Sequence, residues 1–100
     1  MIFAIICTDK EDGLEIRKAN RPDHLEYLKS IKDALKGAGP FMGADGNPNG
    51  SMLLVEMTDM AAAKEFTDND PYAKAGLFAN VDIRPWNWLL ANPYSETKGS

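Results

Sequence analysis

One histidine, His24, is the residue of this sequence best suited to proton transfer. Imidazole is the side chain whose unperturbed pKa lies nearest neutral pH, so it can donate or accept a proton there. His24 precedes Leu28, Ile31 and Leu35 at helical spacing, which places it on the helix face turned toward the sheet. Two interpretations stay open: a proton-transfer group at the rim of the core, or a packed histidine whose nitrogens are satisfied.

Asp45 is a candidate carboxylate for orienting His24. It ends a predicted strand just before Gly46, where an Asp is most often a turn former. A helix start and a strand end can meet at one edge of an α/β layer. A carboxylate bonded to one imidazole nitrogen leaves the other free to act. The sequence therefore permits a catalytic pair of His24 and Asp45.

Arg21 and Ser51 are candidates for holding a ligand. Arg21 lies three residues before His24 and could bind an anionic substrate through two hydrogen bonds, or pair with Asp23. Ser51 invites a Ser–His–Asp interpretation, but the surrounding residues lack the G-x-S-x-G elbow. A structural role, or donation of a hydrogen bond to a ligand, is the more frequent use of such a serine.

Asp70, Pro71 and Tyr72 form a third motif. An Asp followed by Pro is typical of a helix cap and first helical residue. Tyr72, which follows, could face a pocket.

Composition narrows the function classes. The 100 residues suit one domain, and the net charge of −4 disfavours nucleic acid as a partner. No stretch has the ~20 apolar residues that a membrane helix needs, and no export signal is visible, so we expect a cytoplasmic protein. One His and one Cys, Cys7, offer no metal-ligand spacing, and Gly-rich phosphate loops are absent. We predict neither metal nor cofactor.

The elements that must position these residues follow an alternating pattern. Residues 2–8 read as a strand that is apolar on both faces. A turn or two of helix could form over 14–19, before a stronger helix that begins near Asn20 with Pro22 in its first turn. Gly37, Gly39 and Pro40 end that helix. The remaining predictions are strands over 40–45, 51–57 and 78–86, and helices from Thr58 or Asp59 to Phe66 and over 71–75.

The order β-α-β-β-α-β predicts an α+β, ferredoxin-like domain with an antiparallel sheet and helices on one face. The domain spans 1–88, and a C-terminal tail spans 89–100. The first and third strands are apolar on both faces, so the face without helices also needs cover. We expect a homodimer that pairs through this open face. The alternative is that the tail, anchored by Trp86 and Trp88, folds back across the sheet.

Several short motifs together resemble the YCII-related family over residues 1–88. They are the first strand FAIICTDK, Arg21-x-x-His24-x-x-Tyr27-Leu28, Gly39-Pro40, Asp45-Gly46, Gly50-Ser51, the run from Asp70 to Phe78, and Arg84-Pro85-Trp86. The resemblance implies a dimeric α/β-barrel arrangement of ferredoxin-like units. It also implies a His–Asp pair in a cleft, which falls on His24 and Asp45, with Ser51 and the segment from Asp70 to Tyr72 near the cleft. One branch of the family is linked to removing chloride from a chlorinated hydroxyquinol.

Three hypotheses for function follow. The first is an enzyme of isomerase, lyase or dehydrochlorinase type that uses His24 and Asp45 on a small cyclic or anionic metabolite, with substrate bound by Arg21, Ser51, Asp70 and Tyr72. The second is a small-molecule binding or accessory protein without turnover. The third makes His24 and Asp45 a structural clamp between helix and hairpin.

Overall fold

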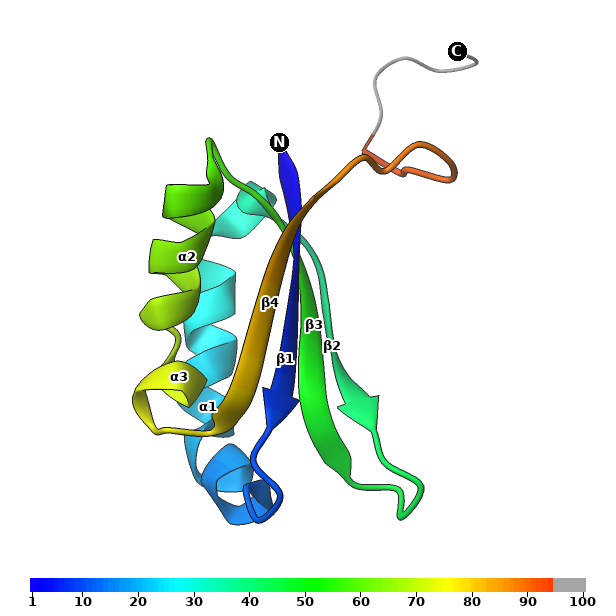
Figure 1. Cartoon of the computed structure of the whole chain (residues 1–100). Helices are drawn as coiled ribbons and strands as arrows, with labels where there is room; N and C mark the ends of the chain where they lie inside the picture. The colour runs from blue at the N-terminus through cyan, green and yellow to red at the C-terminus, as the bar shows by residue number, and fades with distance from the viewer. Residues whose placement is uncertain (95–100) are drawn as a thin grey trace.

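The computed structural model describes residues 1–94 as two layers, a four-stranded antiparallel sheet with helices packed on one face (Figure 1). The strands lie in the order β2-β3-β1-β4. The predicted ferredoxin-like fold is therefore confirmed. The elements are β1 (Ile2–Asp9), α1 (Leu14–Ser30), the 3-10 turn η1 (Lys32–Ala34), β2 (Leu35–Met42), β3 (Pro48–Glu56), α2 (Met60–Asp68), α3 (Pro71–Lys74) and β4 (Phe78–Trp86).

The hydrophobic core lies between the sheet and the helices. β1 is central and pairs with β3 and β4, and its alternate residues Phe3, Ile5 and Cys7 face the helices. Burial of these apolar side chains supplies the main driving force for joining the two layers. The core cluster is completed by Leu28 of α1, Leu53 and Val55 of β3, and Ala63 and Phe66 of α2.

Helix α1 begins and ends earlier than the sequence suggested. The two segments expected on either side of Asn20 form one continuous helix, Leu14–Ser30. Asn20 is not its cap, because its side-chain amide donates to the carbonyl oxygen of Ile16 at 2.9 Å. Pro22 lies inside the helix, where it leaves the carbonyl of Lys18 without its usual donor. Lys18 is exposed, so water can bond that carbonyl.

Strand β2 begins earlier than predicted. Leu35, expected on the apolar stripe of the helix, is instead the first residue of β2, and Gly37, Gly39 and Pro40 lie within the strand rather than ending a helix. Pairing with β3, which matches Gly39 to Met52, stabilises an extended conformation there. Tertiary pairing has overridden the local helix-stop signals.

The hairpin between β2 and β3 turns over residues 43–47, not over 46–50 as predicted. The turn is closed by bonds from the Gly43 N–H to the Asn47 carbonyl at 2.8 Å and from the Gly46 N–H to the Gly43 carbonyl at 3.0 Å. Gly46 has a φ of 83°, a conformation that costs glycine little. Asp45 therefore lies in this turn and not in a strand.

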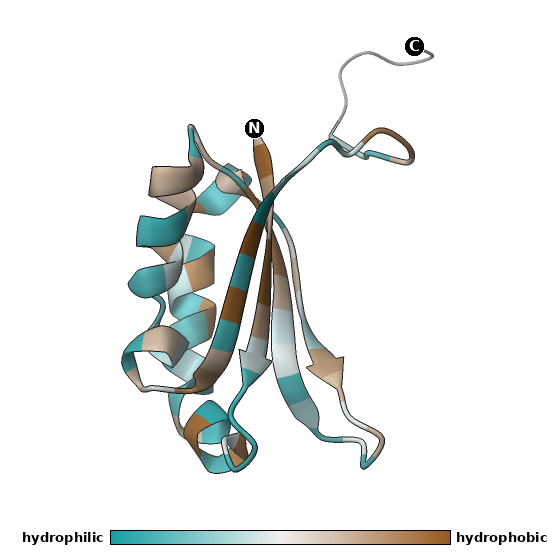
Figure 2. Cartoon of the chain, viewed as in Figure 1, coloured by the Kyte–Doolittle hydropathy of each residue, from teal (hydrophilic) through white to brown (hydrophobic). Residues whose placement is uncertain are grey.

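The sheet face opposite the helices is left open by residues 1–94 (Figure 1). Ile6 of β1 and Met52 of β3 are register partners, and both are half-buried on this face. The strands carry hydrophobic residues along the sheet, as Figure 2 shows. The apolar side chains on the open face of the two central strands are Ile2, Ala4, Ile6, Met52 and Leu54.

The described part of the tail lies beyond one end of the sheet rather than along its open face (Figure 1). The rings of Trp86 and Trp88 are 5.3 Å apart, and Tyr94 meets Trp88 edge-on. The Tyr94 hydroxyl donates to the carbonyl of Lys36 at 3.1 Å. Up to residue 94 the tail therefore does not cover the open face of the sheet, which was the alternative prediction. Residues 95–100 lie outside the described part of the chain.

Candidate functional site

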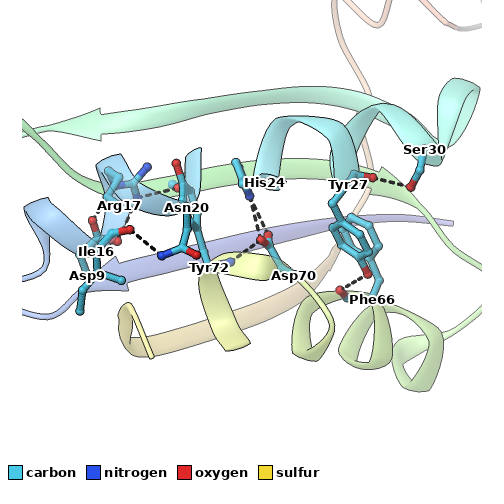
Figure 3. Close-up of polar contacts among 11 residues, drawn as sticks. Asp9, Ile16, Arg17, Asn20, His24, Tyr27, Ser30, Phe66, Asp70 and Tyr72 are labelled. Atoms are coloured by element: carbon cyan, nitrogen blue, oxygen red, sulfur yellow. Dashed lines mark hydrogen bonds and ion pairs between the residues drawn. The ribbon is translucent and has the colours of Figure 1, made fainter. Parts of the chain in front are cut away.

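His24 lies in the middle of α1, 6% exposed, and its partner is Asp70 (Figure 3). Its Nδ1 is 2.8 Å from Oδ1 and 3.0 Å from Oδ2 of the Asp70 carboxylate. A carboxylate only accepts hydrogen bonds, so Nδ1 is the donor. In the neutral imidazole the lone pair is then on Nε2, on the opposite side of the ring.

Asp70 is held by its own helix as well as by His24. It caps α3, and its Oδ1 accepts the Tyr72 backbone N–H at 2.9 Å, with Pro71 at the first helical position. The predicted capping role is confirmed. Only 1% of Asp70 is exposed, so the carboxylate is fixed by these bonds and cannot turn to solvent. The Asp70 side chain therefore both caps α3 and orients His24.

Asp45 does not contact His24, which corrects the predicted pair. It lies in the exposed hairpin turn, where its Oδ1 accepts the Asn47 backbone N–H at 3.0 Å. That bond, together with one from the Asn47 side chain, lowers the pKa of Asp45. This is the turn-forming role that its position before Gly46 favoured.

Arg17 is a buried cation that sequence reasoning missed. Its Nε and Nη2 donate to the two carboxylate oxygens of Asp9 at 2.7 and 2.9 Å, and Nη2 also donates to Ser51 Oγ at 2.9 Å. Burial acts to lower the pKa of Arg17, but the bonds and opposite charge of Asp9 raise it overall. A bidentate pair of this kind fixes the guanidinium plane.

The signal for Arg17 was its position seven residues before His24. Two turns of one continuous helix place both side chains on the same face. The short helix expected over 14–19 was separated from His24, so the relation was not recognised. Asp9 lies where the β1–β4 register shifts, and its side chain is buried.

Tyr72, the predicted pocket residue, lies beside both groups. Its ring stacks on His24 with centres 3.9 Å apart, and the Arg17 Cζ lies 4.8 Å from the ring centre. Burial raises the pKa of Tyr72, and Asp70 adds to this, while Arg17 and Arg21 oppose it. The phenol is therefore held in its neutral form at physiological pH.

A cavity of about 270 Å³ opens beside these residues, between α1 and the strands β2 and β3. Of the predicted site residues, His24, Arg21, Ser51 and Tyr72 line it, whereas Asp70 is behind His24 and Asp45 is elsewhere. Lys18 and Arg21 are exposed at its edge. The remaining lining residues are Leu14, Arg17, Leu25, Leu28, Ala38, Gly39, Pro40, Pro48 and Leu53. The cavity thus has apolar walls, one histidine and three cations.

This arrangement can accept a proton and hold an oxyanion. Among residues 1–94, no group of three or more His, Cys, Asp or Glu side chains lies close enough to hold a metal ion. The thiol of Cys7 is buried in the core between the sheet and the helices. Burial, assisted by Asp70 and Asp9, raises its pKa to about 12. Cys7 is therefore a poor nucleophile, since the thiolate is the reactive form.

Comparison with solved structures gives the class of the fold. A solved structure of 5-chloro-2-hydroxyhydroquinone dehydrochlorinase from Burkholderia phenoliruptrix AC1100, in complex with 2,5-dihydroxybenzoquinone, superposes with a TM-score of 0.83. It is 35% identical, and the match covers 87% of this chain and 94% of that one. The protein is thus an α+β domain of the ferredoxin-like kind seen in that enzyme.

The family follows from the sequence match. Residues 1–87 match the YCII-related domain, and the chain belongs to this family. It is 35% identical to Protein YciI of Escherichia coli O6:H1 over 94 residues, covering 86% of this chain and 96% of that protein. An uncharacterized protein of Haemophilus influenzae is 34% identical over the same shares. In the part of the chain that the structure describes, no helix has the length and apolar character to cross a membrane.

Proposed function

We propose that this protein is a cofactor-independent enzyme of isomerase, lyase or dehydrochlorinase type that acts on a small cyclic or anionic metabolite. The observation that carries the proposal is the buried bond from His24 Nδ1 to Asp70, which directs the Nε2 lone pair away from the carboxylate while the imidazole lines the cavity. Geometry of this kind is that of a general base with its orienting group.

His24 would accept a proton from a hydroxyl or C–H group of the ring at Nε2. The imidazolium that forms is stabilised by the Asp70 carboxylate 2.8 Å from Nδ1. In the dehydrochlorinase case, the electron pair of the broken O–H bond forms a C=O bond, and the imidazolium returns its proton to the ring carbon that carries chlorine. Loss of a second hydroxyl proton to His24 then expels chloride with the C–Cl electron pair. The substrate thus loses one proton and one chloride, with no change in the protein after His24 releases its proton to water.

Arg17 and Ser51 supply the groups that would hold the oxygen on which charge develops. They contact each other at 2.9 Å at one side of the cavity, and Asp9 fixes the guanidinium in place. Donors that are already oriented in a buried site stabilise developing charge more than mobile ones in water do. Arg21, at the exposed edge, would attract an anionic substrate rather than fix it.

Support for the substrate class comes from the structural neighbour. That enzyme's named substrate and bound ligand are both small oxygenated rings. The cavity here has mainly apolar walls, which suits the faces of such a ring, and cations that suit its ionised oxygens.

The test uses 5-chloro-2-hydroxyhydroquinone and a set of small cyclic acids and lactones. NMR would follow each compound during incubation with the protein, and chloride release would be measured for the chlorinated one. Conversion that disappears in a folded His24→Ala variant supports the proposal. Protein signals that shift around His24 without conversion would instead indicate a binding protein for those compounds. Full turnover by His24→Ala would exclude the mechanism.

We also propose that two copies pair through the open sheet face. Ile6 and Met52 lie next to each other at its centre, half-buried, with Leu54 and Ile2 on the same face. An apolar surface of this extent on a small domain is typically covered by a partner. A second copy presents the same surface, so a two-fold axis through it would bury both.

A further inference from the structure

The ring of Tyr72 lies between two side chains of α1, Arg17 and His24 (Figure 3). The imidazole and phenol rings are 3.9 Å apart with their planes 14° from parallel, so His24 occupies one face of the phenol. The Arg17 Cζ is over the same ring at 4.8 Å from its centre. Because the first face is already filled, the guanidinium lies against the second.

The spacing of the helix explains why the ring fits. Arg17 and His24 are two turns apart, an axial separation of roughly 10.5 Å. Two van der Waals layers of about 3.5–4 Å each, one on either side of an inserted ring, account for most of that distance. An aromatic residue from another element can therefore enter between the two side chains.

Other contacts prevent the ring from moving out. The Tyr72 backbone N–H donates to Asp70 at 2.9 Å, and the ring of Phe78 meets it edge-on at 6.2 Å. Only 1% of Tyr72 is exposed. Asp70 thus contacts the edge of the His24 imidazole, while Tyr72 contacts the face of the same ring.

We propose that Tyr72 is a positioning residue whose ring sets the plane of the His24 imidazole and separates it from the permanent charge of Arg17. The catalytic part of this inference rests on the proposed function of His24. When His24 gains a proton, a cation lies on each face of the ring, and the aromatic face attracts both. The hydrogen bond from Nδ1 to Asp70 restrains rotation of the imidazole about its Cβ–Cγ bond. The stacked ring of Tyr72 adds a second restraint on the plane of the imidazole.

The first experiment needs no activity. His24 is the sole histidine of the chain, so its ring protons give one set of NMR signals in ¹³C-histidine-labelled protein. Stacking on an aromatic ring moves these signals upfield of those of free imidazole, when the two are compared in the same protonation state. We expect the upfield position in the wild-type chain and in Tyr72→Phe, and its loss in Tyr72→Leu. A wild-type signal at the free-imidazole position would overturn the inference without any variant.

Tyr27→Leu is the matched control. Tyr27 is on the same helix, stacks on Phe66 at 5.0 Å and donates its hydroxyl to the Phe66 carbonyl. Its removal takes an aromatic ring from the same layer but not from His24. The His24 signals should stay upfield in this variant. If they move as far as in Tyr72→Leu, general loosening of the layer and not stacking is responsible.

The second experiment measures the consequence for turnover of 5-chloro-2-hydroxyhydroquinone. We expect kcat to fall about 10–100-fold in Tyr72→Leu, the scale of a small misplacement of a catalytic group, with a smaller change in KM. Tyr72→Phe should recover most of that loss. Equal losses in both variants would show that the hydroxyl matters and the ring does not, which overturns the inference. No turnover by the wild-type chain would count against the proposed function for this compound, while the NMR position still decides the stacking.

Discussion

The imidazole of His24 and the carboxylate of Asp70 are 46 positions apart in the chain and meet at 2.8 Å in a buried contact. The contact joins the middle of α1 to the residue that caps α3. It therefore depends on the packing of the two helices and not on any local motif. Asp70 is also a cap, so a change at this residue affects both the imidazole and the helix.

Asp70→Asn should reduce turnover by about 10²–10⁴-fold, the contribution of a general base. The amide can donate to Nδ1, which would move the proton of the neutral imidazole to Nε2 and remove the base. Because Asn is also a good cap, α3 should stay folded. Steady-state kinetics on the compound found to turn over, with ¹⁵N NMR of the single histidine to report its tautomer, measures both effects.

Asp45→Asn is the control for this prediction. Asp45 is exposed in the hairpin turn, where its carboxylate accepts hydrogen bonds from Asn47. Turnover and the histidine tautomer should be unchanged. If Asp45→Asn were as damaging as Asp70→Asn, the assignment of Asp70 as the orienting group would be wrong.

Arg17→Met should lower the free energy of unfolding by about 3–5 kcal/mol, because it leaves the Asp9 carboxylate buried without its partner. The double variant Arg17→Met with Asp9→Leu removes both charges and should recover a large part of that loss. Urea denaturation followed by circular dichroism measures each step. A double variant less stable than Arg17→Met alone would contradict this account of the pair.

Stability should decline above pH 9 in part because of Cys7. Burial raises the pKa of its thiol from 9.0 to about 12, so the folded chain keeps a proton that the unfolded chain loses. This contribution is complete below pH 9 and is lost as the pH rises toward 12. At pH 10 the loss is about 1 kcal/mol, one pH unit above the unfolded value. Urea midpoints at pH 8 and 10 should therefore differ less in Cys7→Ala, and equal differences in the two proteins would refute the effect.

Met52→Lys should convert the proposed dimer to a monomer. A lysine beside Ile6 at the centre of the open face would have to lose its hydration in the interface. Sedimentation velocity would show the change, and circular dichroism would show that each chain is still folded. Ala61→Lys, which adds the same side chain on the exposed surface of α2, is the matched control and should still sediment as a dimer. A wild-type chain that sediments as a monomer at all concentrations would exclude the pairing.

Local patterns were sufficient to predict the fold. Alternation and apolar runs indicated all four strands, and Asp59 and Asp70 cap their helices as predicted. Boundaries failed where pairing opposed local signals, as at Gly37 and Gly39, which lie in β2. Pro22 was expected near a helix start, yet the helix continues on both sides of it.

The site could be predicted only in part, for a related reason. His24 was identified because it is unique, and Tyr72 because it follows the cap formed by Asp70 and Pro71. Ser51 was considered because it begins a predicted strand directly after Gly50. The partner of His24 could not be identified in the same way, since two Asp residues, Asp45 and Asp70, both preceded turn or cap residues. Choosing between them requires the packing of α3 on α1, which no local pattern encodes. Arg17 was missed because the error at Pro22 divided its helix.

Helix α3 has only four residues, too few to be stable by its own backbone bonds. Asp70 at its start and Tyr72 within it are attached to α1 through His24 and Arg17. The polar site therefore also holds α3 against α1. Local opening of α3 would break the contacts of the site and of the helix together. Ligand binding in the cavity should therefore slow hydrogen exchange at the Tyr72 backbone amide, compared with the free protein.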